Sequence, residues 1–82
     1  MTQIVPRQTY SADVRLYLAI GTRQLGLSHI GPDHVLLREP VNLEPCEADV
    51  ISIIDGTEYR WRVFLVNGAV PFDHEVEIRD VP

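Results

Sequence analysis

Lysine is absent from this 82-residue sequence, and cysteine and tryptophan occur only once each. The single thiol, Cys46, excludes a disulfide within the chain and is typical of a reducing compartment. No apolar run approaches the ~20 residues that a membrane-spanning helix needs. The N-terminal sequence MTQIVPRQTY also lacks the charged start and apolar stretch of a secretory signal. We therefore expect a cytoplasmic protein that makes no contact with membranes.

Basic residues are scarce. Seven arginines are outnumbered by twelve acidic residues, which gives a net charge of −5. Because neutralising phosphates requires clustered Lys and Arg, this balance argues against binding to DNA or RNA. Arginine does form flat, bidentate contacts with carboxylates and phosphates better than lysine. The composition therefore favours a protein partner over a nucleic acid.

Helical periodicity is nearly absent, whereas apolar and polar residues alternate through most of the chain. We predict six strands, over residues 13–20, 23–30, 34–38, 49–55, 57–66 and 74–80. Asp55-Gly56 and Asn67-Gly68 are strong turn signals between them. The sequence thus predicts one all-β domain over residues 1–82, with residues 1–8 flexible. Its fold would be a small antiparallel six-stranded barrel or a tight two-sheet sandwich.

The longest predicted strand carries the only tryptophan between two arginines. Neighbouring residues on a strand face opposite sides, so Trp61 belongs to an apolar face while Arg60 and Arg62 belong to the other. The two arginines therefore cannot sandwich a base together with Trp61. The side chains that we expect to be mostly buried are Val14, Leu16, Leu18, Leu25, Leu27, Leu36, Ile51, Ile53, Tyr59, Trp61, Val63 and Ile78.

Two apolar residues continue the outward face of this strand. Phe64 and Val66 follow Arg60 and Arg62 at every second position. Outward apolar side chains beside arginines are typical of a contact surface for another protein. We predict that these four residues form an interaction patch.

The Asp55-Gly56 hairpin can close in two ways. A two-residue loop pairs Ile54 with Thr57 and places Ser52 on the Trp61 face. A three-residue loop beginning at Ile54 instead turns Ser52 outward, because a shift of one residue exchanges the two faces of a strand. We predict the three-residue loop, since it removes a polar hydroxyl from the core.

Catalytic and metal-binding patterns are missing. The three histidines, His29, His34 and His74, occur without the CxxC, HxxxH or HExxH spacing of zinc sites. Cys46 lies next to Glu47, with no predicted helix N-terminus or base to activate the thiol. The carboxylates are scattered along the chain, and no phosphate-binding glycine motif is present. We therefore expect no enzymatic activity, no metal and no cofactor.

Residues 26–54 resemble the middle of PilZ domains, which are small six-stranded barrels that bind cyclic di-GMP. That family carries a D/N-x-S-x-x-G motif before a strand. Ser28 and Gly31 match the Ser and Gly of this motif, and Gly26 occupies the position of its acidic or amide residue.

The same family has an R-x-x-x-R motif farther upstream. Arg7 matches its first arginine, and Ser11 replaces the second. The resemblance implies a ligand site that uses Arg7, Ser28 and Gly31. The loss of one guanidinium removes a bidentate donor to phosphate or guanine.

Two functional hypotheses emerge from the sequence. The first is a non-enzymatic protein-interaction or adaptor module, which acts through a protein partner or as a homodimer. The alternative is a PilZ-like sensor of cyclic di-GMP with a degenerate site.

Overall fold

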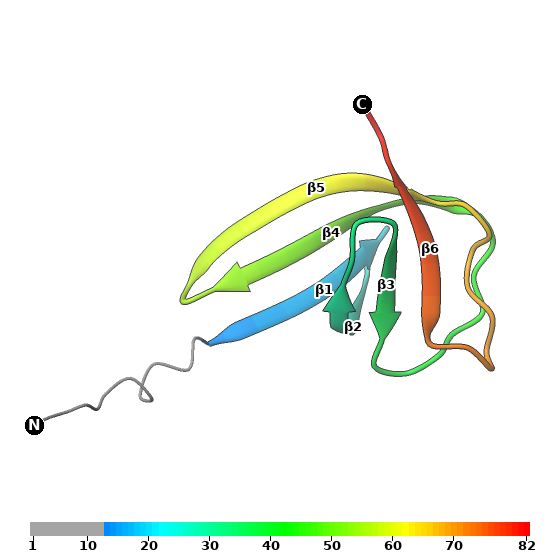
Figure 1. The fold of residues 1–82 in the computed structure, drawn as a ribbon, viewed down its shortest axis with the longest axis horizontal. Helices are drawn as coiled ribbons and strands as arrows, with labels where there is room; N and C mark the ends of the chain where they lie inside the picture. The colour runs from blue at the N-terminus through cyan, green and yellow to red at the C-terminus, as the bar shows by residue number, and fades with distance from the viewer. Residues whose placement is uncertain (1–12) are drawn as a thin grey trace, which may run out of the picture.

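The computed structural model describes residues 13–82, which form six antiparallel strands closed into a barrel (Figure 1). The strands are β1 (Val14–Ile20), β2 (Arg23–Ile30), β3 (His34–Leu37), β4 (Cys46–Ile54), β5 (Thr57–Leu65) and β6 (Glu75–Asp80). Around the barrel their order is β1-β2-β3-β6-β5-β4, and β4 pairs with β1 to close it. The prediction of an all-β barrel is confirmed. The expected flexibility of residues 1–8 falls outside the described residues.

All six predicted strands are present, with small differences at their ends. β4 begins at Cys46, three residues earlier than predicted, because residues 46–48 pair with 65–63 of β5. The interior of the barrel is filled by apolar side chains from every strand. The fully buried large side chains are Leu18, Leu27, Val35, Leu37, Val50, Val63, Leu65 and Val76.

The predicted core is partly correct. Leu18, Leu27, Ile51, Val63 and Ile78 are buried, whereas Leu16, Leu25, Leu36 and Ile53 are only partly buried.

The choice of Leu36 over its neighbours was wrong, since Val35 and Leu37 fill the interior from β3. Three of the four residues in this short strand, His34–Leu37, are apolar. Alternation therefore could not decide which face of the strand points inward.

Val14, Tyr59 and Trp61 are exposed, which contradicts the prediction that they are buried. The reason is a difference in strand length. β4 and β5 pair along all nine residues, but β6 pairs with β5 only at residues 63–65. β2 likewise pairs with β1 only from Tyr17 onward. The beginning of β1 and the β4–β5 hairpin consequently extend beyond the other strands (Figure 1).

The β4–β5 hairpin closes with a two-residue loop, so the predicted three-residue loop was wrong. Ile54 pairs with Thr57, and the loop residues Asp55 and Gly56 have φ of 50° and 85°. Positive φ at both central residues is the geometry that Asp-Gly favours, and its twist matches that of the strands. This local preference outweighs the burial of one hydroxyl. Ser52 consequently lies on the Trp61 face and is 8% exposed.

Candidate functional site

The part of the sheet that extends beyond the barrel is the candidate functional site. We call it the projection and define it as residues 14–16 of β1, 52–54 of β4 and 57–62 of β5. β4 lies in the middle, paired with β1 on one side and with β5 on the other. The tip of the β4–β5 hairpin is hydrogen-bonded to the residue before β1: the Asp13 backbone N–H donates to Asp55 Oδ1 at 3.0 Å. The Asp55 N–H donates in return to the Asp13 carbonyl at 2.9 Å.

One face of the projection continues the lining of the barrel. We call it the inner face, because its residues alternate in step with the buried Leu18, Val50 and Val63. Outside the barrel, no other strand among residues 13–82 pairs with the projection to close it over this face. Its side chains are therefore open to solvent: Val14 is 48% exposed, Ile54 39%, Tyr59 53% and Trp61 37%.

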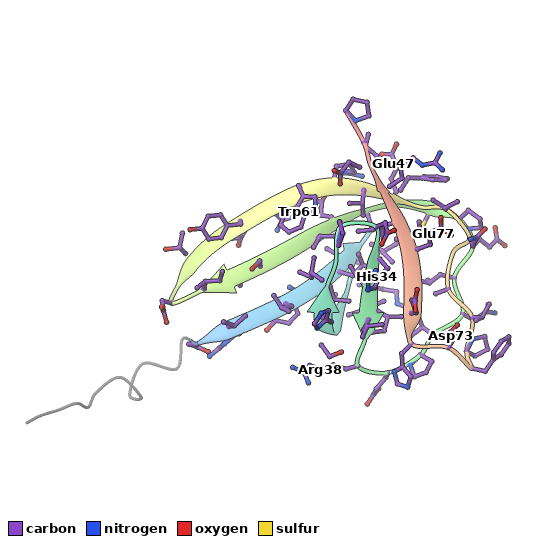
Figure 2. All side chains as sticks on the ribbon, in the orientation of Figure 1. His34, Arg38, Glu47, Trp61, Asp73 and Glu77 are labelled. Atoms are coloured by element: carbon purple, nitrogen blue, oxygen red, sulfur yellow. The ribbon has the colours of Figure 1, made fainter. Side chains whose placement is uncertain are left out.

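Tyr59 and Trp61 are the aromatic residues of the inner face. Each lies opposite a β4 residue that is itself buried, Ser52 for Tyr59 and Val50 for Trp61. Figure 2 shows Trp61 on the part of β5 between the hairpin tip and the crossing with β6. The two rings thus lie on the same face as these buried β4 residues and are partly exposed to water. This geometry leaves two large apolar surfaces available for contact.

The opposite face of the projection and of the adjoining barrel wall carries charges in an ion-pair network. Arg60 donates from Nη1 to Asp49 Oδ2 at 3.0 Å and from Nε to Glu58 Oε2 at 3.2 Å. Arg62 Nε lies 3.0 Å from Asp49 Oδ1, and its Nη1 donates to Glu47 at 3.4 Å. Hydrogen bonds with Glu58 and Asp49 raise the pKa of the Arg60 guanidinium above its ordinary value. Each arginine is thus already paired with carboxylates of its own chain.

The predicted interaction patch lies on this charged face. Phe64 is 38% exposed and Val66 is partly buried. Phe64 is opposite Glu47 on β4 and Arg79 on β6, so charged residues flank it on both sides. Arg60 and Arg62 are opposite Ile51 and Asp49 of β4. The four residues share one face of β5 and its extension, but the larger apolar surface is on the inner face.

Sequence reasoning placed Val14, Tyr59 and Trp61 on the right face but inside the core. The lengths of the predicted strands could have indicated that these residues lie outside the core. The strand predicted over 57–66 is longer than that predicted over 74–80, and the structure has nine residues in β5 against six in β6. A short neighbour cannot cover the whole of a long strand.

The residues that resemble the PilZ motif serve the β2–β3 turn. Ser28 Oγ donates to the Leu36 carbonyl at 3.4 Å, and the Gly31 N–H donates to the His34 carbonyl at 2.7 Å. A Cβ on Gly31 would lie 2.6 Å from the His34 ring, so a larger residue there would displace that ring. Arg7, the third predicted ligand-binding residue, lies outside the described residues.

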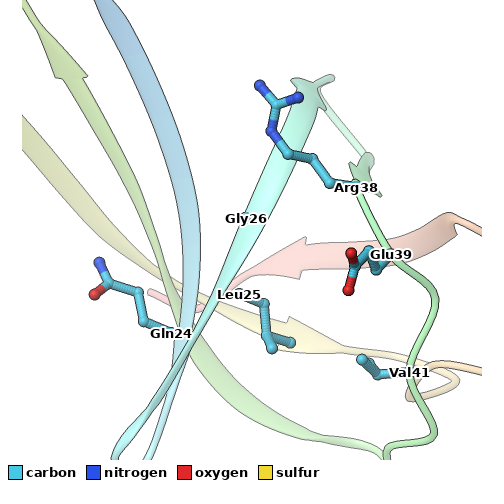
Figure 3. Close-up of a pocket in the computed structure, with 6 residues that line it drawn as sticks. All are labelled: Gln24, Leu25, Gly26, Arg38, Glu39 and Val41. Carbon is cyan, nitrogen blue, oxygen red and sulfur yellow. The ribbon is translucent and has the colours of Figure 1, made fainter.

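A shallow hollow of about 330 Å³ lies beside Gly26, the position where the PilZ motif has a polar side chain (Figure 3). Arg38 borders it, and a Cβ on Gly26 would lie 3.3 Å from Arg38 Cδ. The hollow holds one guanidinium and one carboxylate, that of Glu39, with Leu25 and Val41 beneath. Its volume is at the lower end of the range for small-molecule sites.

Two of the three histidines, His34 and His74, take part in local contacts. His34 Nδ1 lies 2.9 Å from Asp33 Oδ1, and this hydrogen bond lowers the pKa of the Asp33 carboxyl below its ordinary 3.8. His74 Nδ1 lies 2.8 Å from the Leu37 carbonyl. Residues 13–82 contain no group of three or more His, Cys, Asp or Glu placed to hold a metal ion. No helix in this described part of the chain could cross a membrane.

Comparisons of the chain with protein-family models, curated proteins and solved structures return no match. The resemblance to PilZ domains therefore stays a prediction. A function for this chain has to be inferred from the geometry of the projection.

Proposed function

We propose that this protein is a non-enzymatic interaction module that binds another protein through the inner face of the projection. One observation carries the proposal. Seven large apolar residues among 13–82 are exposed, and four of them, Val14, Ile54, Tyr59 and Trp61, lie together on this face. Apolar side chains scattered singly over a surface are ordinary, whereas a contiguous group is typical of a contact site.

The composition of the face fits a protein partner. Tyr and Trp are enriched at the centres of interfaces, where they contribute much of the binding energy. An aromatic side chain has roughly 150–250 Å² to bury, so covering the exposed half of Tyr59 would contribute about 2 kcal/mol at ~25 cal/mol per Å². Charges are confined to the opposite face, which leaves the inner face free of groups that are costly to desolvate.

The net charge supports the same conclusion. At −5, the chain would repel nucleic acids and other polyanions. The partner that suits the inner face is therefore a protein segment with apolar side chains.

Paired substitutions test this function. A Tyr59→Ser/Trp61→Ser variant removes both aromatic rings of the inner face. Phe72→Ser is the matched control, because Phe72 is 84% exposed and lies in the loop before β6, outside the projection. Affinity capture from the cells that produce the protein should recover a partner with the wild type and the control but not with the double variant. Loss of the partner only in Phe72→Ser would contradict the proposed face.

A further inference from the structure

Within residues 13–82, the outer edge of β5 is unpaired along the projection. Among residues 13–82, β6 pairs with β5 only at residues 63–65, and the last contact before the free edge is the Val81 N–H donating to the Arg62 carbonyl at 3.2 Å. Residues 57–61 have β4 on one side and no strand from residues 13–82 on the other. This edge is independent of the inner face, which is formed by side chains.

The free backbone groups of this edge can be assigned. In an antiparallel pair, residues alternate between directing their N–H and C=O toward one neighbour and toward the other. The Arg62 carbonyl points to the β6 side, where it accepts from the Val81 N–H. The Val66 N–H points to the same side and donates to the Glu77 carbonyl at 3.2 Å. Even-numbered residues of β5 therefore point away from β4. Glu58 and Arg60 thus present N–H and C=O groups that no strand of the described residues 13–82 pairs with.

Such an edge is a template for another strand. Proteins commonly protect an edge with charged side chains, above all Lys, or with Pro, a bulge or a covering loop. Residues 57–61, TEYRW, contain neither Lys nor Pro, their two charges have opposite signs, and they pair with β4 without a register shift. The side chains of Glu58 and Arg60 are bonded to each other along their own strand, at 3.2 Å. The edge is regular enough to accept a partner strand.

We propose that the partner is a second copy of this chain, which pairs antiparallel along the same edge about a two-fold axis at Tyr59. In this register, Tyr59 is opposite Tyr59 of the second copy. Glu58 is opposite Arg60 of the second copy, and Arg60 is opposite its Glu58. Both charge pairs are attractive. Glu58 of each copy also exchanges backbone hydrogen bonds with Arg60 of the other copy. Opposite charges and aromatic pairs directly across strands are stabilising.

The neighbouring registers are less favourable. Moving the axis to Glu58 places two glutamates opposite each other, and moving it to Arg60 places two arginines opposite each other. The Arg60 register also brings the second strand against Arg62, whose carbonyl is already bonded to Val81. An axis between residues would put the apolar faces of the two copies on opposite sides. Only the Tyr59 register matches charge, face and hydrogen bonding together.

The resulting dimer joins the two projections into one six-stranded sheet. The inner faces of both copies lie on the same side of this sheet, so the dimer doubles the surface assigned to a protein partner. The contact is small, and small interfaces are weak. We expect dissociation in the micromolar to submillimolar range.

Single cysteines test the register in the full chain, with Cys46→Ser as background. Tyr59→Cys places two thiols across the axis with Cα atoms about 4.5 Å apart, within disulfide range. Trp61→Cys is the matched control, because it lies on the same face but its equivalent is four residues away, ~14 Å along the strand. Under mild oxidation, Tyr59→Cys should cross-link readily and Trp61→Cys should not. Three results would overturn the proposal: equal cross-linking of Tyr59→Cys and Trp61→Cys, stronger cross-linking of Arg60→Cys than of Tyr59→Cys, or no cross-linking of Tyr59→Cys.

A charge reversal tests the dimer without added thiols. Glu58→Arg makes both cross-strand charge pairs repulsive, so sedimentation should show the dimer weakened about tenfold relative to wild type. Glu44→Arg, in the exposed loop before β4, changes the net charge equally and should leave association unaltered. Equal association of both variants would contradict the register.

Hydrogen exchange separates this proposal from the proposed function. If wild type is monomeric and the amides of Glu58 and Arg60 are protected, another part of the same chain covers the edge, and the dimer is wrong. Capture of a protein partner would then still depend on Tyr59 and Trp61. If the Tyr59→Cys dimer forms but no protein partner is captured, the dimer stands and the proposed function fails.

Discussion

At the scale of single residues, Gly68 shows how one backbone position secures the end of the barrel opposite the projection. It has φ of 63°, and a Cβ there would overlap the carbonyl oxygen of Leu43. The next residue, Ala69, exchanges two backbone hydrogen bonds of 2.9 Å with Leu43. Close contact of the two segments therefore requires a residue without a side chain.

We predict that Gly68→Ala lowers the free energy of unfolding by about 3 kcal/mol or more, since it combines a left-handed backbone with steric overlap. Gly21→Ala is the control, because Gly21 has φ of 59° but open space around its Cβ position. That change should cost only about 1–2 kcal/mol. Urea unfolding measures both values, and equal losses would show that the contact with Leu43 is not close.

Trp61 was predicted to be buried and is exposed, and this difference changes the expected cost of its substitution. A core tryptophan would cost about 3–5 kcal/mol when replaced by alanine. Because Trp61 is 37% exposed, part of its surface is already in water, and we expect Trp61→Ala to cost about 2–3 kcal/mol, less than a core tryptophan. Leu65→Ala, on the same strand but fully buried, should cost about 2–5 kcal/mol. A loss of about 5 kcal/mol for Trp61→Ala in chemical denaturation would instead indicate a core tryptophan.

At the scale of elements, the β4–β5 hairpin shows what the sequence determined and what it left open. Alternation identified both strands, and Asp55-Gly56 identified the turn. The polarity of Ser52 predicted the wrong register for the hairpin. Ser52 is buried, while Ile53 is partly exposed on the charged face. Turn geometry was the stronger constraint. The exposure of Tyr59 depended on the length of β6, which lies far away in the sequence.

We predict that Asp55→Ala destabilises the protein by about 1–2 kcal/mol. The substitution removes the carboxylate that accepts from the Asp13 N–H, and alanine is disfavoured at φ of 50°. Asp55→Asn keeps an acceptor and tolerates this conformation, so its stability should stay close to wild type. Thermal unfolding of the two variants gives the comparison. Equal loss in both would mean that the carboxylate charge, rather than turn geometry, stabilises the loop.

At the scale of the whole molecule, six strands of unequal length close one barrel and leave a sheet extending from it. The sequence supported the barrel because turn signals separate six alternating segments. It did not place the projection, because strand lengths alone do not show which strands are neighbours, and the pairings of β1 with β4 and of β3 with β6 join segments remote in the chain. The candidate site is thus a property of the assembled barrel.

The whole-molecule charge also bears on the PilZ resemblance. We expect no binding of cyclic di-GMP tighter than ~10 μM, because a net charge of −5 repels a dianion and tight capture needs several charged donors. Isothermal titration should give no saturable heat at micromolar protein. Submicromolar binding that Arg7→Ala abolishes would favour the sensor instead.

Binding of another protein to the inner face is tested most directly by site-specific photo-cross-linking in the cells that produce the protein. A photoreactive phenylalanine analogue replaces Tyr59 on the inner face or, in a matched chain, Phe72 outside the projection. We predict a covalent adduct between position 59 and a different protein, and none from position 72. Adducts from position 72 alone, or adducts of position 59 only with a second copy of this chain, would contradict the inner face as a protein-binding site.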